Sequence, residues 1–168
     1  MSTKRNQKGF TLIEVVLVLA IGGLIFLLAF LAFGQVSVNR RDTQRKSDAG
    51  RMLAELENWQ GDNSAYPATP TAALTATNLC TGAVTNAVEF SNFLKSYVCK
   101  DGKFSAPGGA SYTTSTTDPA AKDVIRYGTG LRCAVAGTPG STATGATASN
   151  VVIVIGSEKG TSVCRDNT

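Results

Sequence analysis

The side chains that could carry out chemistry in this sequence are its cysteines and a few carboxylates. The chain has 168 residues, including four cysteines, and no histidine. Without imidazole there is no histidine base, no Ser-His or Cys-His nucleophile pair and no histidine-based metal site. Four carboxylates in the second half are scattered and are expected to be surface charges: Asp101, Asp118, Asp123 and Glu158. We therefore expect no catalytic residue, no metal site, no cofactor and no enzymatic activity.

The four cysteines, Cys80, Cys99, Cys133 and Cys164, all lie in the second part of the chain. An even number of cysteines in a small, polar part of the chain favours disulfides and an oxidising, extracytoplasmic location. Buried free thiols or a four-thiolate zinc site are the alternatives, although no two cysteines form a close C-x-x-C pair. Pairing neighbours in the sequence predicts bridges Cys80–Cys99 and Cys133–Cys164, one of three possible pairings.

One carboxylate, Glu14, is placed differently, because it lies inside a long apolar run. Residues Phe10 to Phe33 carry no other charge, and roughly 20 apolar residues suffice to span a bilayer. A cleaved secretory signal has a shorter apolar region and a small-residue cut site, which the end of this run lacks. The run is therefore predicted to be a membrane helix. Glu14 either snorkels to the interface or has a functional partner.

The sequence around Glu14 resembles a known signature. Lys8-Gly9-Phe10-Thr11-Leu12-Ile13-Glu14 is similar to the prepilin motif of type IV pilins, pseudopilins and competence pilins. The resemblance covers about the first 60 residues. It implies that a prepilin peptidase cuts between Gly9 and Phe10 and methylates the amine of Phe10. It also implies that Glu14 pairs with the N-terminal amine of a neighbouring subunit during assembly.

The resemblance implies a structural subunit that is held in the cytoplasmic membrane and polymerised into a surface pilus for adhesion, motility or DNA uptake. Its expected partners are other copies of itself, the prepilin peptidase, the inner-membrane assembly platform and minor pilins. A pseudopilin of a type II secretion system, or a membrane-anchored binding module with a pilin-like N-terminus, is the alternative. The N-terminus is expected in the cytoplasm and the head outside.

The net charge of +4 first suggests an anionic partner. Loss of residues 1–9 removes three basic residues and leaves 13 basic and 12 acidic groups, so strong electrostatic steering is not expected. Aromatic and basic residues alternate between Lys95 and Phe104, with Tyr97, Lys100 and Lys103 between them. Such a stretch could contact single-stranded nucleic acid by stacking and charge, although a head near neutrality gives it little attraction.

The elements that must position these residues follow from periodicity. Proline is absent before residue 67, so one helix can continue past the membrane segment and end near Gly61 to Ser64. On its outer half, charged side chains such as Arg45 are expected outside an apolar stripe at helical spacing. The stripe consists of Ala49, Met52, Leu53, Leu56 and Trp59 or Gln60. This stripe predicts packing against a sheet. The expected division is 1–9 leader, 10–34 transmembrane half, 35–61 amphipathic half and 62–168 extracytoplasmic head.

The head is expected to be α+β, pilin-like, with a small antiparallel sheet on the outer half of the long helix. A capping box at Asn86 to Glu89 predicts a short helix through about Tyr97. Strands are predicted at the following ranges: Val124–Tyr127, Leu131–Ala136, Val151–Ile155 and Thr161–Cys164. The polar stretches Ser105–Ala120 and Gly137–Asn150 are predicted loops, which could be adhesive or carry O-linked glycans.

Overall fold

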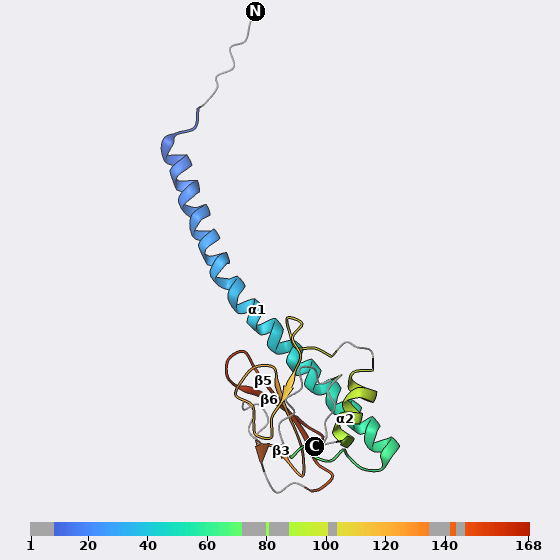
Figure 1. Cartoon of the computed structure of the whole chain (residues 1–168). Helices are drawn as coiled ribbons and strands as arrows, with labels where there is room; N and C mark the ends of the chain where they lie inside the picture. The colour runs from blue at the N-terminus through green and yellow to red at the C-terminus, as the bar shows by residue number, and fades with distance from the viewer. Residues whose placement is uncertain (1–8, 72–79, 81–87, 101–103, 135–141, 144–146) are drawn as a thin grey trace, which may run out of the picture. The chain divides into compact units, whose positions relative to one another are not determined.

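The computed structural model describes residues 9–71, 80, 88–100, 104–134, 142–143 and 147–168 (Figure 1). Its longest element is helix α1, Leu12–Asn63. The chain divides into two compact units, one ending at Asn39 and one beginning at Arg40, and α1 contributes to both. The architecture is α+β, with a long apolar N-terminal helix and a small four-stranded sheet. This confirms the predicted fold class, apart from the strand directions described below.

The first unit consists of the apolar part of α1. Its large side chains face outward, and Phe26, for example, is 74% exposed. Gly22, Gly23 and Gly34 all lie within the helix, and a methyl group added at any of them would meet nothing within 4 Å. Among the described residues, α1 is the one helix that is long and apolar enough to cross a membrane. An apolar surface of this kind is stable in lipid, where no burial within the chain is needed.

The second unit is built around the outer half of α1. Ala49, Met52 and Leu56 are fully buried, as the apolar stripe predicts. The helix ends at Asn63, and Ser64 follows it with a positive φ of 60°. The Ser64 backbone N–H donates to the Gln60 carbonyl at 2.7 Å, so a serine takes the left-handed cap position that glycine usually fills.

A short helical segment packs on the end of α1. It consists of α2, Val88–Phe93, continued by a π-helical turn, η1, Leu94–Val98. The predicted helix is therefore confirmed, while its capping residue Asn86 lies outside the described residues. Trp59 of α1 contacts the rings of Phe93 and Tyr97 edge-on, with centroids 6.1 and 5.3 Å away.

Four strands form the main sheet, in the order β1-β2-β5-β6. Their bounds are Thr113–Thr114, Val124–Thr129, Val151–Gly156 and Ser162–Asp166. The pairs β2–β5 and β5–β6 are antiparallel, with Ile125 opposite Ile155 and Ile155 opposite Val163. A second, two-stranded sheet pairs β3, Arg132–Cys133, with β4, Thr142–Ala143.

The prediction of a purely antiparallel sheet was wrong in one respect, because β1 pairs with β2 in parallel. Both β1 and β4 are two-residue strands inside stretches that were predicted as loops. Such short pairs have no alternating pattern to reveal them, because tertiary contacts decide whether they form. Of the strand predicted at Leu131–Ala136, the described residues 131–134 contain only the two residues of β3, and residues 135 and 136 lie outside the described residues.

The core lies between α1 and the sheet. Every residue of β5 is buried. Val151, Ile153 and Ile155 belong to the cluster that contains Met52 and Leu56. The stacked rings of Phe90 and Tyr127, 4.8 Å apart, join the short helix to β2.

Two disulfides close the head. Cys80 bonds to Cys99 and Cys133 bonds to Cys164, the pairs expected from the sequence. Their sequence separations are 19 and 31 residues. Loops of this size correspond to roughly 3–4 kcal/mol of stabilisation each in the chain-entropy account. The bridges therefore supplement a core that is small for a head of this size.

Gly156, the last residue of β5, provides a test of the packing. A β-carbon at this position would lie 1.8 Å from the Ala121 carbonyl oxygen, so Gly156→Ala should lower the free energy of unfolding by about 1–3 kcal/mol or more. Gly50→Ala is the matched control, because nothing lies within 4 Å of that exposed helical site. It should gain about 0.5–1 kcal/mol. Urea unfolding of the two variants in detergent measures both; equal stabilities would contradict the packing described here.

Candidate functional site

The N-terminal junction is the first candidate site. Gly9 and Phe10 precede α1 outside regular secondary structure, and Phe10 is 90% exposed. A side chain at Gly9 would meet nothing within 4 Å. The peptide bond between these residues is therefore open to an approaching enzyme. Lys8 lies outside the described residues.

Glu14 lies in the first turn of α1, and its carboxylate is held by Thr11. The Thr11 backbone N–H donates to Glu14 Oε2 at 2.9 Å, and the Thr11 hydroxyl donates to the same oxygen at 2.7 Å. The Glu14 backbone N–H donates in turn to the Thr11 carbonyl at 3.1 Å. The carboxylate that accepts from the N-cap backbone N–H forms one half of a capping box and stabilises the first turn. The other half is replaced, because the Glu14 N–H donates to the Thr11 carbonyl and not to the Thr11 hydroxyl.

Sequence reasoning had not recognised this partial capping box, although Thr-x-x-Glu before an apolar run is the known pattern of a capping box. Both contacts from Thr11 reach Oε2. Among the described residues, Oε1 accepts no hydrogen bond, so it can receive a further donor. The carboxylate is thus oriented within its own chain and still has one acceptor available.

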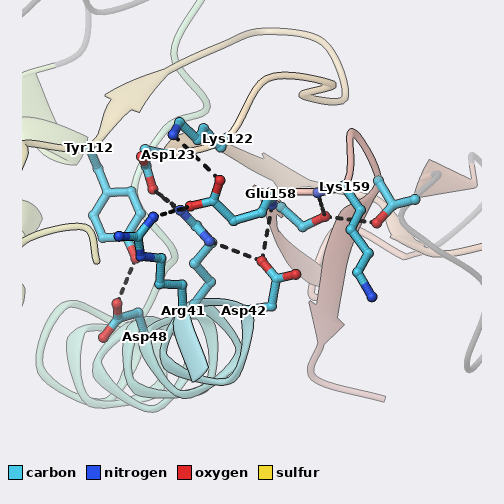
Figure 2. Close-up of polar contacts among 11 residues, drawn as sticks. Arg41, Asp42, Asp48, Tyr112, Lys122, Asp123, Glu158 and Lys159 are labelled. Carbon is cyan, nitrogen blue, oxygen red and sulfur yellow. Dashed lines mark hydrogen bonds and ion pairs between the residues drawn. The ribbon is translucent and has the colours of Figure 1, made fainter. Parts of the chain in front are cut away.

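A second site lies in the head, around Arg45 of α1. The Arg45 side chain is completely buried. Its Nε and Nη2 donate to Asp123 Oδ1 at 3.0 and 2.7 Å, its Nη1 donates to Asp42 Oδ1 at 2.9 Å, and Nη2 also donates to Glu158 Oε1 at 3.0 Å. One guanidinium therefore joins three carboxylates, which Figure 2 shows gathered beside the helix.

Further contacts extend this Arg45 cluster. The Glu158 backbone N–H donates to Asp42 Oδ1 at 3.0 Å. Arg41 and Lys122 lie 3.5 and 3.4 Å from the carboxylate oxygens of Glu158. The three cations Arg41, Arg45 and Lys122 therefore balance the three carboxylates in number. A buried ion pair is favourable only when its hydrogen bonds are satisfied in this way.

The sheet register explains why two distant carboxylates meet. Because Ile125 of β2 lies opposite Ile155 of the antiparallel β5, the residue before β2 and the residues after β5 lie at the same end of this strand pair. Asp123 and Glu158 occupy these places. Asp123 has a positive φ of 62°, and its carbonyl accepts a hydrogen bond from the Thr113 backbone N–H at 3.0 Å, which secures the start of β1.

Two pKa shifts follow from these contacts. The hydrogen bond from Arg45 is the main reason that the pKa of Glu158 is lowered. A carboxylate whose folded pKa is lowered contributes stability at neutral pH, and this contribution is lost as the pH falls through the folded value. At Tyr112, burial and then the hydrogen bond to Asp48 raise the pKa well above its ordinary value. The hydroxyl therefore stays protonated and donates to Asp48 Oδ2 at 2.6 Å.

The structure corrects two sequence predictions here. Arg45 was placed away from the apolar stripe, yet it lies on the same face, four residues before Ala49. Asp123 and Glu158 were expected to be surface charges, whereas their side chains are only 19% and 14% exposed. Helical spacing could have placed Arg45 on the buried face. The carboxylates that compensate its charge depend on strand pairing, which the spacing does not reveal.

Two aromatic residues of the stretch considered for nucleic-acid stacking make contacts within the head. Phe104 is only 7% exposed. The Tyr97 ring packs on Trp59, and its hydroxyl donates to Asp62 at 2.6 Å. Tyr97 and Lys100 line a surface hollow of about 460 Å³ that also contains Glu55 and Asp62. Arg51 also lines it, so two cations and two carboxylates leave the hollow without the net positive charge that would attract phosphate groups. Lys103 lies outside the described residues.

Comparison with known proteins bears on the N-terminal junction. Residues 4–30 match the family model for the prokaryotic N-terminal methylation motif, which is the type IV prepilin signature. No curated protein and no solved structure matches the chain. In the part of the chain that the structure describes, no group of three or more His, Cys, Asp or Glu residues could hold a metal ion.

The Arg45 cluster predicts a large difference between two neighbouring arginines. Arg45→Met keeps an apolar stem but leaves three carboxylates without their common partner, so it should cost about 3–5 kcal/mol of folding stability. Arg41→Met removes a side chain that is 48% exposed and should cost about 0–1 kcal/mol. Denaturant unfolding of both variants at neutral pH checks this. A similar loss in the two would show that the cluster does not hold the head together.

Proposed function

We propose that this type IV pilin- or pseudopilin-like protein is a structural subunit of a surface pilus. In this proposal a prepilin peptidase removes residues 1–9, the apolar part of α1 holds the subunit in the cytoplasmic membrane, and the assembly platform polymerises it into a filament. The observation that carries the proposal is the match of residues 4–30 to the prepilin signature.

Two further observations support this proposal. The large side chains of the first unit are exposed, so they need lipid or other subunits around them. The head has two disulfides, which are stable in an oxidising compartment. The proposed orientation therefore places the head outside the cytoplasm and the N-terminus inside. Minor pilins and other copies of the chain are its proposed filament partners.

Processing supplies the cation that Glu14 would bind. Cleavage between Gly9 and Phe10 frees an amine at Phe10, and this amine stays protonated after methylation. Opposite charges about 4 Å apart attract by about 4 kcal/mol at an effective dielectric constant near 20. We propose that Oε1 of Glu14 accepts the amine of a neighbouring subunit while Thr11 continues to hold Oε2. The pairing would then set the register between subunits.

A pseudopilin of a type II secretion system would share the same N-terminal motif, and so would an anchored binding module. Isolation of sheared surface filaments separates the three. A major pilus subunit is abundant in this material, a pseudopilin is rare there under ordinary expression, and an anchored module stays with the membrane.

The cleavage site is tested by intact-mass analysis of the mature protein. We expect the mass of residues 10–168 with both disulfides formed and one added methyl group. Gly9→Val should retain the leader, because its side chain occupies the approach to the bond, while the head keeps both disulfides. A mature wild-type protein that still begins at Met1, or that begins after Phe33, would refute the processing site.

The role of Glu14 is tested with two substitutions. Glu14→Gln can still accept the hydrogen bonds of Thr11 but carries no charge, whereas Glu14→Val loses both properties. If charge pairing drives assembly, both variants should insert and be cleaved normally, yet filament number should fall roughly tenfold or more, because the attraction that each loses is worth several kcal/mol. Electron microscopy and shearing measure the filaments. Normal filament numbers with Glu14→Gln would mean that helix capping, and not pairing, is the role of this residue.

A further inference from the structure

Two basic residues of α1 are not used by the Arg45 cluster. Arg40 and Lys46 are both exposed. Among the described residues, neither belongs to an ion pair, whereas Arg41, Arg45 and Lys122 are all paired with carboxylates. Because that cluster is already balanced, the charges of Arg40 and Lys46 are available to an external partner.

Covalent geometry places Arg40 close to the end of the apolar segment. Six residues separate it from Gly34, which is about 9 Å along a helix and at most about 20–22 Å in any conformation. A bilayer of about 40–45 Å total thickness with a 30 Å hydrocarbon core has headgroup layers of about 5–8 Å. The long Arg40 side chain can therefore reach the headgroups of a membrane that contains the apolar segment.

We propose that Arg40 binds the phosphate groups of anionic lipids at the outer surface of the membrane. This interaction rests on the membrane insertion that the proposed function requires. A guanidinium group forms paired hydrogen bonds with phosphate. The neighbouring Arg41 is not assigned this role, because it already lies 3.5 Å from Glu158 in the Arg45 cluster.

Lys46 lies six residues further along the same helix, about 9 Å beyond Arg40. It has the same charge, is also exposed and lies on the same element. Twelve residues separate it from Gly34, twice the separation of Arg40 from Gly34. The proposal therefore predicts that lipid binding depends on Arg40 and does not depend on Lys46, which makes Lys46 the matched control.

The test uses the full mature chain in vesicles of phosphatidylcholine that contain phosphatidylglycerol. Selectivity for spin-labelled phosphatidylglycerol over spin-labelled phosphatidylcholine is measured for the wild type, Arg40→Gln and Lys46→Gln. A basic residue near an anionic surface contributes about 1 kcal/mol, so Arg40→Gln should lower the selectivity up to about fivefold. Lys46→Gln should leave it unchanged. Salt should weaken the wild-type selectivity.

The outcomes are distinguishable from those of the filament experiments. Equal selectivity in Arg40→Gln and the wild type overturns the lipid proposal, and so does an equal loss in Arg40→Gln and Lys46→Gln. If Arg40→Gln abolishes filaments but leaves the selectivity unchanged, the partner of Arg40 is an acidic surface of a neighbouring subunit, and the lipid proposal is wrong. Carbonate extraction checks insertion separately, and a chain that does not insert also overturns it. A chain that shows the selectivity but never forms filaments contradicts the pilus function alone.

Discussion

The head depends on the need to compensate one buried positive charge. Arg45 is completely covered, and a guanidinium that leaves water without partners is strongly unfavourable. Its partners come from α1 itself, from the segment before β2 and from the loop after β5. The ion pairs that compensate the Arg45 charge therefore hold both of these segments against the helix. Gly156 approaches the Ala121 carbonyl closely at the same end of the β2–β5 pair. A larger side chain there would push apart the segment before β2 and the loop after β5.

The apolar segment obeys a different constraint. Its side chains have no cover within the chain, so they require a membrane or the apolar surfaces of other subunits. Either environment is compatible with the proposed function, in which the subunit is held in lipid before assembly and packed among copies of itself afterwards. A subunit of this kind must carry its folding information elsewhere. The buried aromatic core, the Arg45 cluster and the two disulfides of the head supply it.

The partial capping box at Thr11 and Glu14 links local structure with the proposed assembly chemistry. The helix start needs acceptors for its free N–H groups, and the carboxylate supplies one to Thr11. The same carboxylate keeps an acceptor oxygen for an incoming amine. A residue that both begins the helix and receives a neighbour's cation is oriented before the neighbour arrives, which reduces the entropy lost on pairing.

Local periodicity along the chain was enough to predict the long helix, its apolar segment and the strongest strands. The disulfide pairs were predicted as one of three possible pairings, and the fold of the head selected Cys80–Cys99 and Cys133–Cys164. The motif at Gly9, Phe10 and Glu14 was also visible in the sequence, since its members are close neighbours. Three features appear only in the folded head: the parallel pairing of β1 with β2, the burial of Arg45, and the contacts of Arg45 with Asp123 and Glu158. Asp123 and Glu158 are 78 and 113 positions from Arg45 in the sequence. Only the register of β2 against β5 brings them to one place, and no local pattern encodes that register.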